Sequence, residues 1–540
     1  MRFIFALALI AAGALPAAAQ RITPAEVDGH LRFLASDLLE GRAPATRGGE
    51  LATEYIASEL RAAGLEPGVN GSYFQRVPID VASTDSASMH VVASGKASGP
   101  LRFPDDVVIW AGSAVPSTVA HADIVFAGYG VSAPEYKWDD FKDVDVKGKI
   151  LLVLVNDPPA TAKEPKLFGG KAMTYYGRWT YKFEEAERRG AVGALIVHTT
   201  AAASYPWHTV VASWTTPQRM LPRNPALPAP LGFRGWITDS AATALLAHAG
   251  LDLAHLRKEA ATRAFHPVNT GITLDVAFKS TVQHLDSRNV VAVIPGRDKS
   301  LGRQYVAYSA HWDHFGLGPK VNGDSIYNGA VDNASGVSTL LAVARAAAQA
   351  PRTRRSMVFV FVTAEEAGLL GSSWFAQHPT MPDSDIVADL NLDVVTVLGK
   401  VRDLNVLGAD KSTLGPMLGH LIAPNGMRID PDAHPEAGHF YRSDHFSFAQ
   451  AGIPAVSIGA GTDYVGKPKT WGVQQDDDYT AHRYHQPADN YSPDFDLSGA
   501  AQIGEIVLHF GTALANSPVL PAWNPDAEFQ SARGAQHKIS

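Results

Sequence analysis

The stretch YVAYSAHWD, residues 305–313, decides the fold, because a short apolar run ends there in histidine and aspartate. Its first half, residues 305–309, is short and rich in aromatic and apolar side chains, which is typical of a β-strand. Similar runs predict strands at residues 290–294, 357–362, 386–392 and 453–458. Helices fit between them, notably over residues 337–348 and 497–513. This alternation favours the α/β class, with a mostly parallel sheet and flanking helices.

Side chains that bind metals or protons follow the ends of these strands. They are His311, Asp313, Asp332, Glu365, Glu366, Asp393 and His485. Asp332 stands in a polar, glycine-containing loop, residues 328–336, which opens onto a helix, and His485 stands in the loop 484–489. In open α/β sheets, ligands collect outside the carboxyl ends of the strands. We therefore expect these side chains to form one site rather than a scatter of surface charges.

The types of side chain in this set favour zinc. Two imidazoles and three carboxylates could hold two divalent ions if one carboxylate bridges, and mixed nitrogen and oxygen ligands suit zinc. The chain has no cysteine, so a thiolate site is excluded. Two metal ions can polarise a carbonyl and lower the pKa of a shared water. Glu365 is then free to take the proton of that water, and Asp313 could orient a ligating imidazole.

Each of these motifs alone also has an ordinary structural explanation. A histidine and an aspartate in a loop are usually unrelated, and adjacent glutamates at a strand end are usually a solvated turn. Residues 332–336 could be merely a helix cap, for which Asp, Asn and Ser are preferred. Only the ordered combination indicates a site. Other histidines are expected mostly at the surface or around the ligands: His314, His434, His439, His445 and His482.

The ordered set resembles the co-catalytic di-zinc aminopeptidase family, which also contains glutamate carboxypeptidase and transferrin receptor. The resemblance implies a zinc exopeptidase fold, two Zn²⁺ per chain and hydrolysis of N-terminal residues from peptide substrates. By position it pairs His311 with Asp393 on one zinc and Glu366 with His485 on the other, with Asp332 bridging. Glu365 then matches the general base and Asp313 the orienting group. The segment Ser443-Asp444-His445, followed by residues 451–455, resembles the edge of the family's pocket, without a specific role.

The rest of the chain divides into segments that differ in composition and in the pattern of apolar residues. Residues 1–19 have a positive start, an apolar run and small residues before a cleavage point, which predicts a signal peptide and export to the periplasm or the medium. Residues 20–102 are expected to be a helical N-terminal part of the peptidase domain, and Gly41-Arg42 resembles the lead-in of bacterial members. Residues 103–268 resemble an inserted, β-rich protease-associated domain, in which Asp139-Asp140 is expected to be a solvated turn. Residues 269–520 are the expected catalytic domain, and residues 521–540 a tail.

Composition and charge restrict the functions further. The chain has 46 basic and 54 acidic side chains, a net charge of −8. This balance argues against a nucleic-acid partner, which would need a basic excess. After the signal, no stretch is apolar enough to span a membrane. A carboxypeptidase of the same fold remains an alternative, but it needs a cationic pocket that Arg442 alone does not establish. A non-catalytic binding homologue and a single-zinc glutaminyl cyclase are less favoured by a complete set of ligands and base. The sequence makes no prediction about oligomeric state.

Overall fold

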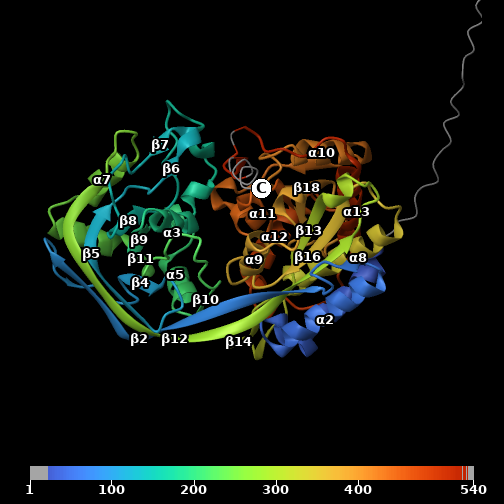
Figure 1. Ribbon diagram of the computed structural model, residues 1–540, viewed down its shortest axis with the longest axis horizontal. Helices are drawn as coiled ribbons and strands as arrows, with labels where there is room; N and C mark the ends of the chain where they lie inside the picture. Colours follow the sequence, from blue (N-terminus) through green and yellow to red (C-terminus); the bar gives the residue numbers. More distant parts are fainter. Residues whose placement is uncertain (1–21, 526, 531, 533–540) are drawn as a thin grey trace, which may run out of the picture.

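The computed structural model describes residues 22–525, 527–530 and 532 as two lobes (Figure 1). The predicted signal peptide, residues 1–19, lies outside the described residues, as do residues 526, 531 and 533–540 of the predicted tail. One lobe holds the N-terminal helices and the second half of the chain, and the other holds the segment between them. Among the described residues, every helix is too short or too polar to cross a membrane.

A mixed sheet forms the centre of the first lobe. Its strand order is β19-β18-β20-β17-β13-β16-β12. Their bounds are β12 Val268–Ile294, β13 Tyr305–His311, β16 Ser356–Val362, β17 Ile386–Asn391, β18 Asp403–Leu407, β19 Arg428–Asp430 and β20 Ala455–Ala460. The four central strands, β16, β13, β17 and β20, run parallel to one another, whereas β12 runs antiparallel to β16 and β18 antiparallel to β20. The predicted α/β class and five strands are confirmed, and the sheet is mixed because of these two antiparallel pairings.

Helices cover both faces of this sheet. Successive residues of β13 alternate between two cores: Tyr308 packs with α8 (Gly336–Gln349) and α13 (Ser498–Asn516), and Ala307 packs in the opposite core. The opposite core includes Phe375 of α9 (Leu370–Gln377) and Phe448 of α11 (His445–Gln450). The approach of α13 is close, because a Cβ at Gly511 would lie 1.8 Å from the Tyr308 hydroxyl. The two predicted helices, 337–348 and 497–513, are confirmed.

The N-terminal helices are shorter than the predicted helical segment, residues 20–102. Helix α1 (Pro24–Leu34) begins after Thr23, whose hydroxyl accepts a hydrogen bond from the Glu26 N–H, and α2 (Arg47–Ala62) follows. From Phe74 to Gly95 the chain is instead the long strand β2. The correction has a physical reason, since Val77, Ile79 and Val81 are buried at every second position, the period of a strand.

Strands β2 and β12 pair antiparallel, with Phe74 opposite Val290 and Gly95 opposite Ile272, and run from one lobe into the other (Figure 1). In the second lobe, β5, β8, β9 and β11 are parallel neighbours, with β4 antiparallel at the edge. Their bounds are β4 Val107–Ala111, β5 Ser117–Phe126, β8 Ile150–Leu154, β9 Gly193–His198 and β11 Phe233–Thr238. Helix α3 (Trp179–Arg188) packs on this sheet. That this lobe is a protease-associated domain with bounds 103–268 stays a prediction.

The expectation of a solvated turn at Asp139-Asp140 is right for one residue and wrong for the other. Asp139 accepts hydrogen bonds from the N–H groups of Phe141 and Lys142 and is exposed. Asp140 is buried, and its carboxylate accepts hydrogen bonds from the Val131 N–H and the Trp138 indole. Burial raises the pKa of Asp140 to about 6. Neither residue lies in the predicted metal site.

Candidate metal centre

The predicted ligands converge at the carboxyl ends of the parallel strands. His311 is the last residue of β13, Glu365 and Glu366 lie in the turn that follows β16, and Asp393 follows β17. Because these three strands are parallel neighbours, their ends lie at one edge of the sheet. Asp332 and His485 reach the same place from two loops.

Two groups of side chains meet at Asp332. On one side, His311 Nε2 lies 3.3 Å from Asp332 Oδ1 and 3.2 Å from Asp393 Oδ1. On the other side, His485 Nε2 lies 3.3 Å from Asp332 Oδ2 and 3.3 Å from Glu366 Oε2. Asp332 therefore presents one carboxylate oxygen to each histidine. The structure brings together all five predicted ligands in the pairing that the resemblance implies.

These distances fit zinc coordination. Ligand atoms about 2.0–2.1 Å from a tetrahedral zinc lie about 3.3 Å from each other. A charge-assisted N–H···O hydrogen bond is shorter, about 2.7–2.9 Å. All four nitrogen-to-oxygen distances at this site match the spacing of neighbouring ligands, and one ligand atom each of His311, Asp332 and Glu366 lies within 4.8 Å of the others. The mixed donor set also suits zinc.

The electrostatics of the cluster favour a bound cation. Burial alone disfavours a charged His311, but the carboxylates of Asp393 and Glu365 outweigh it and raise the pKa of His311 well above its usual value. Burial, with Asp332 nearby, raises the pKa of Glu366 well above its usual value. Burial opposes ionisation of Asp332, yet the neighbouring imidazoles of His311 and His485 hold its pKa well below the usual value. Buried carboxylates in this number are stable only when paired with positive charge.

Glu365 and Asp313 lie next to the ligand His311. Glu365 Oε2 lies 4.0 Å from His311 Nε2, and the Glu365 side chain is 12% exposed. The Glu365 N–H donates to Asp313 Oδ1, which fixes the turn. Asp313 was expected to orient an imidazole with its carboxylate, but that carboxylate is 3.9 Å from His311 Nδ1. The backbone carbonyl of Asp313 lies 3.2 Å from the same nitrogen and makes the orienting contact instead.

Asp489 and His314 lie beside the ligands, and sequence reasoning did not give either a specific function. Asp489 accepts hydrogen bonds from the N–H groups of Val331 and Asp332, so it holds the loop that carries the shared carboxylate. His314 is buried, with Nδ1 2.5 Å from Glu366 Oε1 at an angle that is not that of a hydrogen bond. Burial lowers the pKa of His314 to about 4. The sequence did hold a signal for both residues, which is their position next to a ligand. Asp489 lies in the same loop as His485, and His314 lies three residues after His311.

The remaining histidines divide as expected into surface and interior groups. His434 and His482 are mostly exposed, and His439 is partly exposed. His445 is fully buried against the Phe440 ring, and burial lowers the pKa of His445 to about 4. Asp444 is also buried, whereas Arg442 is exposed and donates to the Ala437 carbonyl.

Arg42 ties the N-terminal segment to the loops of the site. Its guanidinium is 1% exposed and donates to four backbone carbonyls, those of Leu34, Trp312, Asn328 and Gly329. Burial lowers the pKa of Arg42 to about 10, which leaves it charged at neutral pH. The loop it holds is tight, because Gly329 has a φ of 55° and a Cβ there would lie 2.1 Å from the Asp332 carbonyl.

Replacing Arg42 tests this anchoring. Arg42→Lys keeps the charge, but a single ammonium group cannot replace the three nitrogens of the planar guanidinium. Some of the buried carbonyls therefore lose their hydrogen-bond donor. We expect the free energy of unfolding to fall by about 2–4 kcal/mol. Urea denaturation measures it. Arg47→Lys, at an exposed position of α2, is the matched control and should change stability by less than about 0.5 kcal/mol. Equal stability of the two variants would show that the four carbonyls do not depend on Arg42.

Comparison with known proteins agrees with this geometry. Residues 289–511 match the model of peptidase family M28. The chain is 27% identical to a probable leucine aminopeptidase 2 of Aspergillus oryzae over 231 residues, 41% of this chain and 43% of that protein. It is 26% identical to leupeptin-inactivating enzyme 1 of Streptomyces exfoliatus over 258 residues, 46% of this chain and 55% of that protein. The matches thus span about half the length of these curated relatives.

Among solved structures, an aminopeptidase from Aneurinibacillus sp. strain AM-1 is similar at 18% identity and a TM-score of 0.48, with 94% of this chain and 97% of that chain covered. The match to the family model includes every predicted ligand, from His311 to His485. Residues 289–511 of this chain therefore form a domain of peptidase family M28.

Proposed function

We propose that the protein is a di-zinc metallo-aminopeptidase that removes N-terminal residues from peptides. The observation that carries the proposal is the shared carboxylate of Asp332, with one oxygen 3.3 Å from His311 and the other 3.3 Å from His485. A carboxylate placed in this way is a bridge between two cation sites. The names of the relatives, a probable leucine aminopeptidase among them, support the reaction class.

The ligands divide between the two sites. His311 and Asp393 would hold one zinc, Glu366 and His485 the other, and Asp332 both. When bound, the two ions would polarise the scissile carbonyl, acidify the attacking water and stabilise developing negative charge. The Asp313 carbonyl, 3.2 Å from His311 Nδ1, fixes the ring so that Nε2 faces the site.

Glu365 is the proposed general base. Its carboxylate is not needed as a ligand, lies on the His311 side of the cluster and is partly open to solvent. Burial, with Glu366 and Asp393 nearby, raises the pKa of Glu365 well above its usual value in the absence of metal. A carboxylate held beside the attacking water can accept its proton and return it to a leaving amine.

The cation that the sequence offers for a carboxypeptidase pocket is engaged elsewhere, which favours aminopeptidase activity. The carboxylates of Asp332, Glu366 and Asp393 would be neutralised by the zinc ions they hold, so the charge of the cluster does not itself set the direction of cleavage. A carboxypeptidase needs a cation for the substrate's terminal carboxylate. Arg442, the candidate in the sequence, is exposed and donates to the Ala437 carbonyl. The non-catalytic alternative is disfavoured because both the ligands and Glu365 are in place.

Export and the role of the second lobe belong to the same proposal. The signal-peptide pattern of residues 1–19 supports a protein that acts in the periplasm or outside the cell. The second lobe, proposed as a protease-associated domain, contacts the catalytic lobe close to the segment before Asp444. The Met173 N–H donates to the Pro435 carbonyl, and the Gln450 amide donates to the Tyr175 hydroxyl. From this position the lobe would shape access to the site.

Blocked substrates test the direction of cleavage. We expect the zinc-loaded protein to hydrolyse amino-acid p-nitroanilides and to leave the same compounds untouched when the α-amine is acetylated, because acetylation removes the free amine that an aminopeptidase recognises. Absorbance of released p-nitroaniline measures both series. Comparable rates on the acetylated series, or release only of C-terminal residues from peptides, would favour the carboxypeptidase alternative. Inertness toward every peptide would favour the binding homologue.

A further inference from the structure

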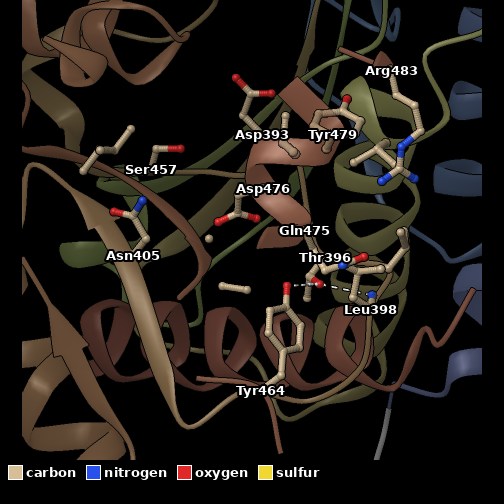
Figure 2. A pocket seen from close by; sticks show the side chains of 16 residues that line it. Asp393, Thr396, Leu398, Asn405, Ser457, Tyr464, Gln475, Asp476, Tyr479 and Arg483 are labelled. Atoms are coloured by element: carbon tan, nitrogen blue, oxygen red, sulfur yellow. Dashed lines mark hydrogen bonds between the residues drawn. The ribbon is translucent and has the colours of Figure 1, made fainter. Parts of the chain in front are cut away.

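A pocket opens directly beside the candidate metal centre (Figure 2). It has a volume of about 240 Å³, and its wall includes Asp393, a proposed ligand, and Val331, which precedes the shared Asp332. A cavity of this size holds one side chain rather than a folded partner, since each water in the liquid takes up about 30 Å³. In the proposed aminopeptidase reaction, the side chain nearest the metal centre is that of the substrate's first residue.

Part of the pocket wall is apolar. Val397, Leu398 and Tyr464 come from the segments that follow β17 and β20, and Leu407 comes from β18. The Tyr464 hydroxyl and the Thr396 hydroxyl are 2.8 Å apart and satisfy each other. These groups form a surface for an aliphatic chain but offer no charge.

A carboxylate without a basic partner among the described residues also lines the pocket. Asp476 belongs to α12 (Trp471–His482), and Figure 2 shows it extending from the helix toward the side where Asn405 and Ser457 lie. In the described part of the chain, no Lys, Arg or His comes within 4.0 Å of its carboxylate. Burial, with Asp477 and Asp403 nearby, raises the pKa of Asp476 to about 6, so the group is ionised at neutral pH.

Arg483, the basic residue among those that line the pocket, is already paired with an acidic side chain. Arg483 lies 3.3 Å from Asp478, and its guanidinium packs over the Tyr479 ring at 5.4 Å. Asp393 would be neutralised by the zinc it holds, so Asp476 is the carboxylate of the pocket wall left to pair with a substrate, which favours a cationic side chain and disfavours an acidic one.

We propose that Asp476 is a specificity-determining residue, which makes the enzyme prefer peptides that begin with lysine or arginine. The aliphatic stem of such a residue lies along Val397, Leu398 and Leu407, and its charged end pairs with the Asp476 carboxylate. Long basic side chains suit this division, because their methylene stem is apolar and only the tip is charged. The inference rests on the proposed aminopeptidase function.

The test compares the p-nitroanilides of lysine and norleucine, whose unbranched side chains differ at the terminal ammonium group. We expect the wild-type enzyme to show a higher kcat/KM for lysine than for norleucine, and a lower one for glutamate. In Asp476→Asn the ratio of lysine to norleucine should fall about tenfold, the lower end for one charge-assisted hydrogen bond, because Asp476 is exposed when no substrate is bound. The loss should fall mainly on KM, with zinc content unchanged.

Asp477→Asn is the matched control. It removes the same charge from the next residue of α12, which is exposed and does not line the pocket, so the ratio should stay within about twofold of the wild type. A ratio that is unchanged in Asp476→Asn, that falls equally in both variants, or that favours norleucine in the wild type overturns the inference and leaves the aminopeptidase function standing. Hydrolysis of none of the three substrates by zinc-loaded wild type refutes the proposed function, and the inference with it.

Discussion

Removal of metal from the purified protein is expected to abolish peptide hydrolysis, and added zinc is expected to restore it. Elemental analysis should find about two zinc ions per chain, because Asp332 presents one oxygen to each of two ligand groups. Stripped protein should remain folded at moderate temperature, since the sheet and its two cores do not depend on the site. Circular dichroism before and after chelation measures this.

The pH dependence of zinc binding follows from the ligands' protonation. Without metal, the pKa values of His311 and Glu366 lie well above their usual values. Zinc binds the deprotonated forms, so protons compete with it, and the affinity falls as the pH falls through these raised values. Titration calorimetry at several pH values should show weaker binding and more protons released under acid conditions. Full activity in stripped protein, or an affinity that rises on acidification, would contradict the proposed site.

The central sheet and the identity of the ligands were open to sequence reasoning because both are encoded locally. Each strand is a short apolar run, and each candidate ligand follows such a run or lies in a short polar loop. Parallel strands place their ends together, so His311, Glu366 and Asp393 had to be neighbours once the strands were recognised. Asp332 and His485 joined the set as polar residues of two loops, the resemblance supplied their pairing, and in the structure His485 Nε2 lies 3.3 Å from Asp332 Oδ2.

Features that depend on long-range contacts were missed. Arg42 donates to the backbone carbonyls of Trp312 and Asn328, which lie 270 and 286 residues further along the chain. No local pattern distinguishes a buried arginine that binds carbonyls from an exposed one. Asp140 reads as a polar turn because its burial comes from the fold around Trp138. Strand β2 did carry a local signal, the alternation of Val77, Ile79 and Val81, but its 22 residues are long for a strand and its middle, residues 83–88, is mostly polar.

Glu365→Gln is expected to lower turnover by about 10²–10⁴-fold while both zinc ions and the fold are retained. Glutamine keeps the size of the side chain but cannot accept the proton from the attacking water. The Glu365 N–H bond to Asp313 is made by the backbone and survives the substitution. Measured kcat, zinc content and thermal stability of the same preparation separate loss of the base from loss of metal.

Glu366→Gln is the matched comparison, because it changes the adjacent residue in the same chemical way. Glu366 Oε2 lies 3.3 Å from His485 Nε2, the spacing of two ligands on one ion, whereas Glu365 Oε2 lies 4.0 Å from His311 and is not needed as a ligand. Glu366→Gln should therefore bind the ion shared with His485 more weakly and lose activity for that reason, and a higher zinc concentration should restore part of it. Added zinc should not rescue Glu365→Gln. If Glu365→Gln loses metal while Glu366→Gln keeps two ions, the roles of the two glutamates are exchanged. The 3.3 Å contact with His485 would then not mark a ligand.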